Sequence, residues 1–149
     1  MNPDFLDIIR ALLDAEVRFI IVGAYAVNLY VDPRATGDLD IWVEPTPANA
    51  PKVIRALKQF GAPLANVTEA DFASPEVTFQ IGLPPRRIDL LTTLSGLEFV
   101  EAWADREEFP FGPLTVPFLS KASVVKNKRA TGRPKDLADL DALDKESNR

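Results

Sequence analysis

Three aspartates lie within stretches that otherwise have the pattern of β-strands. Asp38 and Asp40 stand two apart in an alternating run, so their side chains share one strand face, with β-carbons about 7 Å apart. Asp89 interrupts the apolar run 88–91. Like charges this close repel unless a cation lies between them, and a carboxylate is rarely buried without a partner. Three carboxylates from two strands could therefore hold a pair of divalent ions about 3.5–4 Å apart, the spacing used in phosphoryl displacement.

The composition narrows the chemistry further, because the chain contains no histidine and no cysteine. This excludes disulfides, thiolate metal sites and every histidine-ligated zinc or iron site. Oxygen ligands alone favour a hard cation, so the expected cofactor is Mg²⁺ or Mn²⁺. The alternative is that Asp38 and Asp40 lie on a solvated strand face and Asp89 caps a strand end. The Gly23-Ala24 turn upstream and the apolar surroundings of Asp89 favour the metal site.

Hydrophobic periodicity predicts the elements that position these acids. Helices are expected at about 4–15, 24–30, 47–60, 97–104, 121–130 and 134–144. Strands are expected at 18–22, 38–43, 77–81 and 86–91, with short strands between 109 and 119. The strands at 77–81 and 86–91 should form a hairpin. Residues 62–75 are expected to form a loop with a short helix, and residues 145–149 to be disordered.

These elements predict an α/β protein in an α+β arrangement. We expect a small mixed sheet of about four or five strands with helices packed on one side. The length fits one domain over residues 1–149, with a C-terminal helical segment at about 120–144. The acidic, amphipathic N-terminus does not resemble a signal peptide, and no apolar run approaches the ~20 residues of a membrane span. The expected location is the cytoplasm, with no membrane partner.

A basic segment lies near the C-terminus although the net charge of the chain is −5. Its members, which span fifteen positions without an acid among them, are Lys121, Lys126, Lys128, Arg129, Arg133 and Lys135. Helical spacing places Lys128 near Val124, so Lys128 is expected to reach inward. The segment either neutralises a triphosphate and contacts an acceptor RNA, or is a solvated helix face. Asp136 and Asp139 either orient these cations or simply occupy a helix first turn, where negative charge is favourable. The structural role in the first turn is the favoured expectation.

The turn and the first two acids belong to a longer pattern, which consists of residues 22–24 (Val-Gly-Ala), thirteen further residues and then 38–41 (Asp-Leu-Asp-Ile). This pattern resembles the motif of nucleotidyltransferases of the DNA polymerase beta superfamily. Residues 34–38 (Arg-Ala-Thr-Gly-Asp) resemble the stretch before the acids in minimal bacterial members, including abortive-infection toxin-type nucleotidyltransferases. Lys128 and residues 132–140 resemble the C-terminal tail of those proteins. The likeness covers nearly the whole chain.

The resemblance implies transfer of a nucleoside monophosphate from a nucleoside triphosphate to an acceptor hydroxyl by two-metal catalysis. The acceptor would be RNA such as tRNA, a protein or a small molecule, and an antitoxin partner is a further expectation. Asp38, Asp40 and Asp89 would be both catalytic and metal-binding. The residues expected to bind nucleotide are Gly23, Ala24, Arg34, Thr36, Lys128 and Lys135. One departure is Ala24, where the wider family prefers Gly or Ser; the hydroxyl is lost but the backbone N–H groups are kept.

Two other functions stay open at this point. The chain could be a non-catalytic member of the same fold that binds nucleotide or a partner protein as a regulatory ligand. It could instead be a toxin–antitoxin component that binds RNA through the basic segment. Trp42 follows the acids on the same strand face, where it either stacks on a base or packs in the core or its rim, and packing is the favoured expectation.

Overall fold

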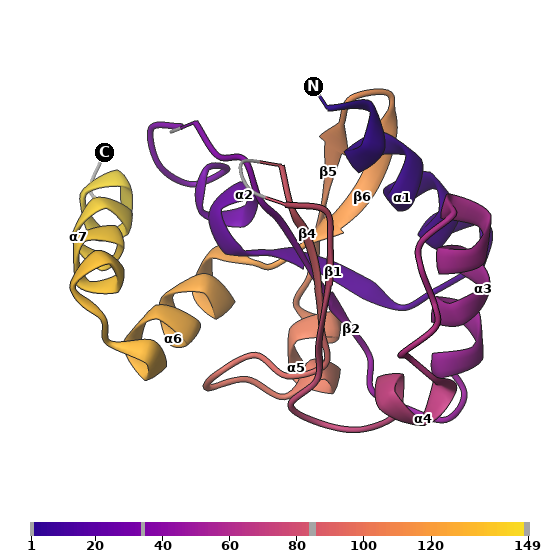
Figure 1. Cartoon of the computed structure of the whole chain (residues 1–149). Helices are drawn as coiled ribbons and strands as arrows, with labels where there is room; N and C mark the ends of the chain where they lie inside the picture. The colour runs from indigo at the N-terminus through magenta and orange to yellow at the C-terminus, as the bar shows by residue number, and fades with distance from the viewer. Residues whose placement is uncertain (1, 34, 84–85, 148–149) are drawn as a thin grey trace.

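Six strands form one mixed sheet in the computed structural model, which describes residues 2–33, 35–83 and 86–147 (Figure 1). The strand order is β3-β4-β2-β1-β6-β5. The strands are β1 (Phe19–Val22), β2 (Leu39–Val43), β3 (Thr78–Ile81), β4 (Ile88–Leu91), β5 (Glu107–Phe111) and β6 (Leu114–Phe118). Consecutive pairs β1–β2, β3–β4 and β5–β6 are antiparallel, whereas β2–β4 and β1–β6 are parallel. The mixed sheet and the expected β3–β4 hairpin are thus confirmed, but the sheet has six strands rather than four or five, because the segment from 107 to 118 adds a full hairpin.

Helices lie on both sides of this sheet. They are α1 (Pro3–Asp14), α2 (Gly23–Val27), α3 (Ala50–Phe60), α4 (Glu69–Phe72), α5 (Phe99–Ala104), α6 (Lys121–Thr131) and α7 (Pro134–Ser147). In Figure 1, α1, α3 and α4 lie to the right of the sheet, and α6 and α7 lie to the left. The α+β arrangement is confirmed, but the expected placement of helices on one side holds only for α1, α3 and α4. None of the helices in the described residues has the length and apolar character needed to cross a bilayer.

The central strands are buried on both faces, which is why their sequences are nearly continuous apolar runs. In β2, Leu39, Ile41 and Val43 face one side and are fully buried, while Asp40 and Trp42 face the other. Trp42 packs edge-on against Phe99 of α5, with ring centroids 5.1 Å apart. The expectation that Trp42 packs in the core is confirmed. The alternation in β2 therefore separates a core face from the face that carries the acids.

Several helix boundaries differ from those predicted: α2 ends at Val27 rather than near Tyr30, α5 starts at Phe99 rather than near Leu97, and α3 and α7 differ as well. The helix α3 starts at Ala50 rather than near Pro47. A turn precedes it, in which the Thr46 hydroxyl accepts from the backbone N–H of Asn49 at 3.2 Å. The helix α7 continues to Ser147, whereas the sequence pattern predicted disorder from Lys145 onward. An ion pair of 3.0 Å between Lys145 and Asp141, one turn earlier, stabilises this last stretch of helix.

The strands β3 and β5 form the two edges of the sheet. The edge strand β5 carries three exposed residues, Glu107, Glu108 and Pro110. Its partner β6 continues directly into α6, whose first turn is capped by Ser120 accepting from the Ser123 N–H. The β5–β6 hairpin therefore sets where α6 and α7 begin.

Candidate active site

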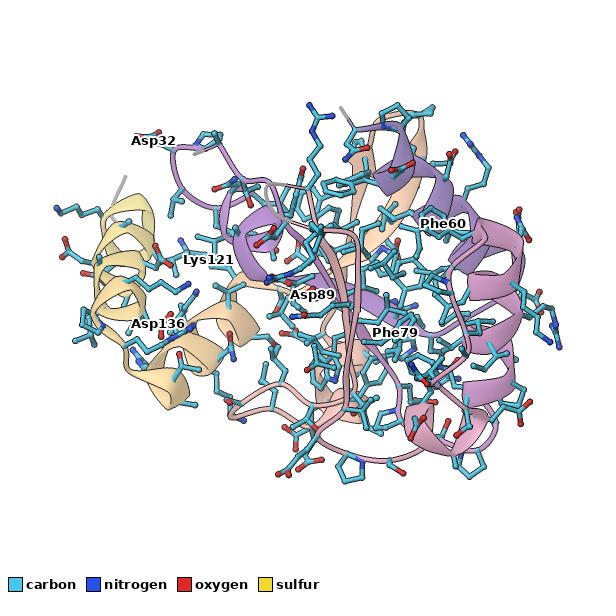
Figure 2. All side chains as sticks on the ribbon, viewed as in Figure 1. Asp32, Phe60, Phe79, Asp89, Lys121 and Asp136 are labelled. Carbon is cyan, nitrogen blue, oxygen red and sulfur yellow. The ribbon has the colours of Figure 1, made fainter. Side chains whose placement is uncertain are left out.

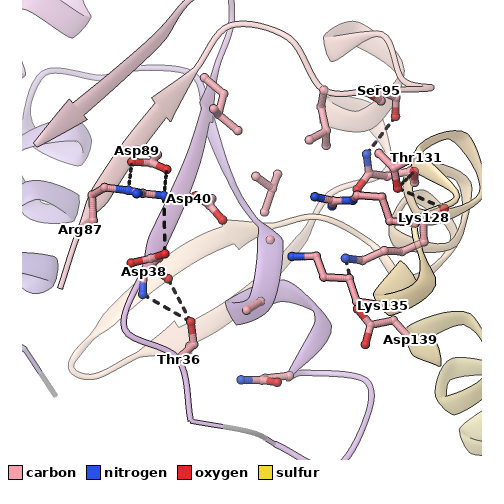
Figure 3. A pocket seen from close by; sticks show the side chains of 18 of the residues that line it. Thr36, Asp38, Asp40, Arg87, Asp89, Ser95, Lys128, Thr131, Lys135 and Asp139 are labelled. Carbon is pink, nitrogen blue, oxygen red and sulfur yellow. Dashed lines mark hydrogen bonds and ion pairs between the residues drawn. The ribbon is translucent and has the colours of Figure 1, made fainter. Parts of the chain in front are cut away.

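The three aspartates meet where β2 and β4 run side by side. Asp40 and Asp89 are direct partners in this parallel pairing, so their side chains leave neighbouring strands on the same face. Asp38 immediately precedes β2 and shares that face. Figure 3 shows the three carboxylates grouped at one end of a cavity. The predicted convergence of Asp38, Asp40 and Asp89 is confirmed.

An arginine that the sequence analysis overlooked holds two of these acids. The guanidinium of Arg87 donates from Nε to Oδ1 of Asp89 at 2.9 Å and from Nη2 to Oδ2 at 3.1 Å. Its Nη2 also lies 3.6 Å from Oδ2 of Asp38. The hydrogen bond to Asp89 is the main reason that the pKa of Arg87 is raised. The signal was present, because residues two apart on a strand share a face, and Arg87 and Asp89 have opposite charge.

The electrostatic surroundings of Asp40 disfavour its ionised form. Burial, and then the charges of Asp89 and Asp38, raise its pKa to about 6, although Arg87 and Lys135 act in the opposite direction. A carboxyl group with a raised pKa is one whose ionised form costs free energy in the folded protein. A cation bound beside Asp40 would remove that cost.

Gly23 allows Asp40 to occupy this position. The residue has φ +69°, and a Cβ built on it would overlap the Oδ2 atom of Asp40. We expect Gly23→Ala to lower the free energy of unfolding by about 2–4 kcal/mol, from backbone strain together with overlap against Asp40.

A matched control for this prediction is Gly61→Ala. Gly61 also has positive φ, +91°, but a Cβ there would meet nothing within 4 Å. It should therefore cost only the backbone strain, about 1 kcal/mol. Urea denaturation of both variants measures the difference, and equal losses would show that the contact with Asp40 contributes nothing.

The opposite end of the cavity is formed by α6 and α7. Lys128 is 8% exposed and forms ion pairs of 3.2 Å with both Asp136 and Asp139. Asp136 is fully buried and also accepts from Arg133 Nε at 2.7 Å and from the Arg133 backbone N–H at 3.1 Å. The hydrogen bond from Arg133 is the largest of the contacts that hold the pKa of Asp136 well below its usual range. Asp136 and Asp139 thus orient the cations, and Asp136 also lies in the first turn of α7, so both of the roles considered apply to it.

Acids and bases face each other across this cavity of about 650 Å³. Figure 3 shows Asp38, Asp40 and Asp89 on one side and Lys128 and Lys135 on the other. In the wider view of Figure 2, Asp89 lies on the sheet and Asp136 on the C-terminal helices beside it. The cavity therefore joins the two parts of the chain that the sequence analysis treated separately.

The remaining predicted residues can be placed in the same cavity. Gly23 and Ala24 line it, and so does Thr36, whose hydroxyl lies 3.4 Å from the Asp38 N–H and shapes the approach to β2. Arg34 was also predicted to bind nucleotide, and it lies outside the described residues. All the other predicted site residues line this cavity.

The basic segment does not form one continuous patch. Lys128, Arg133 and Lys135 line the cavity, whereas Lys126 pairs with Glu101 of α5 at 3.7 Å on the surface. Arg129 lines a separate depression between α6 and α7. The cations that face the acids are thus a subset of those that the sequence grouped together.

The donor set suits a hard divalent cation, but its present arrangement does not enclose one. Carboxylate oxygens from neighbouring strands are the ligands that Mg²⁺ and Mn²⁺ prefer. Among the residues described, no set of three Asp, Glu, His or Cys side chains is arranged to hold a metal ion. The guanidinium of Arg87 instead balances the charge of Asp38 and Asp89.

Comparison with known proteins adds no relative to this picture: no protein-family model and no curated protein sequence matches the chain. The cavity itself indicates what the site can bind. One end offers carboxylates for a cation, and the other offers ammonium and guanidinium groups for an anion. A polyphosphate bound together with divalent cations has both kinds of charge.

Proposed function

We propose that the protein is a metal-dependent nucleotidyltransferase that moves a nucleoside monophosphate from a nucleoside triphosphate to an acceptor hydroxyl. The observation that carries the proposal is the pairing of Asp40 with Asp89 on neighbouring strands, opposite Lys128 and Lys135 across one cavity. This separation of charge matches a triphosphate whose metal-bound end faces the acids. The proposed location is the cytoplasm, and the acceptor is an RNA such as tRNA, a protein or a small molecule.

The residues have distinct roles in this reaction. Asp38, Asp40 and Asp89 would hold Mg²⁺ or Mn²⁺, which when bound polarises the phosphate and offsets charge in the transition state. Asp89 accepts the proton of the acceptor hydroxyl while the hydroxyl oxygen forms its bond to the α-phosphorus. The bond between the α-phosphorus and the bridging oxygen breaks, and pyrophosphate leaves. Lys128 and Lys135 neutralise the triphosphate, mainly by electrostatic stabilisation.

The turn at Gly23 and Ala24 gives the nucleotide close access to the backbone, since neither residue has a side chain beyond a methyl group. Ala24 cannot supply the hydroxyl that Ser would offer at this position. Phosphate contacts at this turn would therefore come from the backbone alone.

A second candidate function is a non-catalytic nucleotide-binding module. The observation that favours it is the contact of Arg87 with Asp38 and Asp89, which balances two acids without a metal. Such a module would bind a nucleoside triphosphate and release it unchanged. The two candidates therefore differ in turnover rather than in binding.

A transfer assay tests the proposal. The protein is incubated with each α-phosphate-labelled nucleoside triphosphate, Mg²⁺ or Mn²⁺, and either an RNA or a protein mixture. We expect label on an acceptor with the wild type, and at least about 100-fold less with Asp89→Asn, because a metal ligand contributes several kcal/mol to the transition state. Asp7→Asn is the matched control, since Asp7 is 61% exposed on α1. Nucleotide binding without labelled product would favour the non-catalytic module, and equal labelling by Asp89→Asn would remove the assigned site.

A further inference from the structure

We propose that Arg87 is a tethered cation that competes with the divalent metal for Asp38 and Asp89, and so sets the metal concentration at which the site fills. The inference rests on the proposed function, because it takes these acids to be metal ligands. It assigns to Arg87 a regulatory contact inside the same site.

The contacts of Arg87 use oxygens that a metal would need. Its Nε and Nη2 atoms take one oxygen each of Asp89, at 2.9 and 3.1 Å, in a two-point arrangement. The same Nη2 lies 3.6 Å from Asp38. Guanidinium groups bind carboxylates most strongly in this fork geometry, and they do not lose their proton in proteins. A metal ion therefore cannot take both acids while this cation stays between them.

The backbone and the side chain of Arg87 differ in their freedom to move. The next residues, Ile88, Asp89 and Leu90, are buried in β4, which has partners on both sides in the sheet. The Arg87 side chain, by contrast, lines the open cavity and is 28% exposed. It can leave the acids by side-chain rotation alone, while the strand that carries Asp89 stays in place.

Lys128, which is buried at the cavity wall, is not a competitor of this kind. Lys128 is held by Asp136 and Asp139 at 3.2 Å each, at the far end of the cavity and away from the proposed metal ligands. Arg87, by contrast, is in direct contact with two of the proposed metal ligands, Asp38 and Asp89. Its removal leaves Asp38, Asp40 and Asp89 with more uncompensated negative charge, which attracts a divalent cation.

Metal binding measured by calorimetry tests this inference without an activity assay. Mn²⁺ is titrated at fixed ionic strength into the full-length wild type, Arg87→Ala, Arg87→Lys and Arg86→Ala. Arg86 is the adjacent, exposed arginine, so its substitution makes the same change in net charge outside the contact. We expect Arg87→Ala to bind Mn²⁺ about tenfold more tightly than the wild type, and Arg86→Ala to change affinity by no more than about twofold.

Arg87→Lys keeps the charge but loses the two-point contact, so its affinity should fall between those of the wild type and Arg87→Ala. It also serves if the alanine variant fails to fold. A thermal melt with and without Mn²⁺ supplies a second measurement. Mn²⁺ should raise the melting temperature of Arg87→Ala more than that of the wild type. The inference is overturned if Arg87→Ala binds Mn²⁺ no more tightly than the wild type does. If only Arg87→Lys folds, the same comparison is made with that variant.

The result also separates this inference from the proposed function. If the wild type transfers label and Arg87→Ala binds Mn²⁺ with unchanged affinity, the role of Arg87 is rejected and the proposed transferase activity is kept. Tighter Mn²⁺ binding without any transfer supports the competition and rejects the transferase. A wild type and an Arg87→Ala variant that both fail to bind Mn²⁺ overturn both.

Discussion

Asp40→Asn is expected to make the metal-free protein more stable at pH 8, by about 1–2 kcal/mol. Burial and the charges of Asp89 and Asp38 raise the pKa of Asp40 to about 6, so its ionised form is disfavoured in the folded state. The folded pKa exceeds the unfolded one, near 4, so the wild type loses stability as the pH rises from about 4 to about 6. Asparagine avoids this loss, and its advantage should disappear at pH 4 and below.

The same substitution is expected to lower Mg²⁺-dependent transfer by at least about 100-fold, because a bridging ligand is removed. Denaturation at pH 4 and pH 8, with and without Mg²⁺, is measured beside the transfer assay. Asp7→Asn should show neither effect, since Asp7 is an exposed residue of α1. A variant that is active, or that unfolds more easily than metal-free wild type at pH 8, would make Asp40 a structural residue.

Asp136→Ala is expected to reduce the free energy of unfolding at pH 7 by about 3 kcal/mol, because loss of a buried ion-pair partner leaves charge uncompensated. Asp136 is fully buried and binds both Lys128 and Arg133. Asp139 still pairs with Lys128, so we place the loss at the low end of the usual range. The folded pKa of Asp136 is lowered, so its contribution is complete above the unfolded value near 4 and is lost as the pH falls below it.

Urea denaturation at pH 7 and at pH 3 measures this loss, which should shrink at the lower pH. Asp141→Ala is the control on the same helix, because Asp141 is 69% exposed and pairs only with Lys145 among the contacts described. A surface change of this kind costs less than about 0.5 kcal/mol. If Asp136→Ala costs no more than Asp141→Ala, the buried network does not hold α7 against α6.

The local sequence pattern was enough to predict where the acids lie. Alternation through residues 38–43 gave Asp38 and Asp40 a common face, and the apolar neighbours of Asp89 placed it in a strand. Lys128 was expected to reach inward because of its spacing from Val124, and it lines the cavity. In each case the side-chain direction follows from the repeat of the element, 2.0 residues for a strand and 3.6 for a helix. Residues nearby in the sequence are enough to show that repeat.

Contacts between distant residues could not be predicted in the same way. Asn49 bonds the backbone of Arg18 with both ends of its side chain, at 2.8 and 3.1 Å, and this long-range contact accompanies the later start of α3. The sequences of α6 and α7 are only weakly amphipathic, so they do not show which side of the sheet these helices cover. The pairing of Arg87 with Asp89 could have been predicted from their spacing, but its contact with Asp38 could not, because Asp38 lies just before a different strand.

The two edges of the sheet also affect how the chain behaves when many copies are close together. An unpaired strand edge can template the addition of a strand from another molecule, which begins aggregation. Pro110 has no N–H to offer at the β5 edge, and the exposed carboxylates of Glu107 and Glu108 repel a second copy of the same strand. At the other edge β3 spans only four residues, from Thr78 to Ile81. Both edges are therefore poor templates for aggregation, so crowded copies of this chain would fold with little risk of joining sheet to sheet.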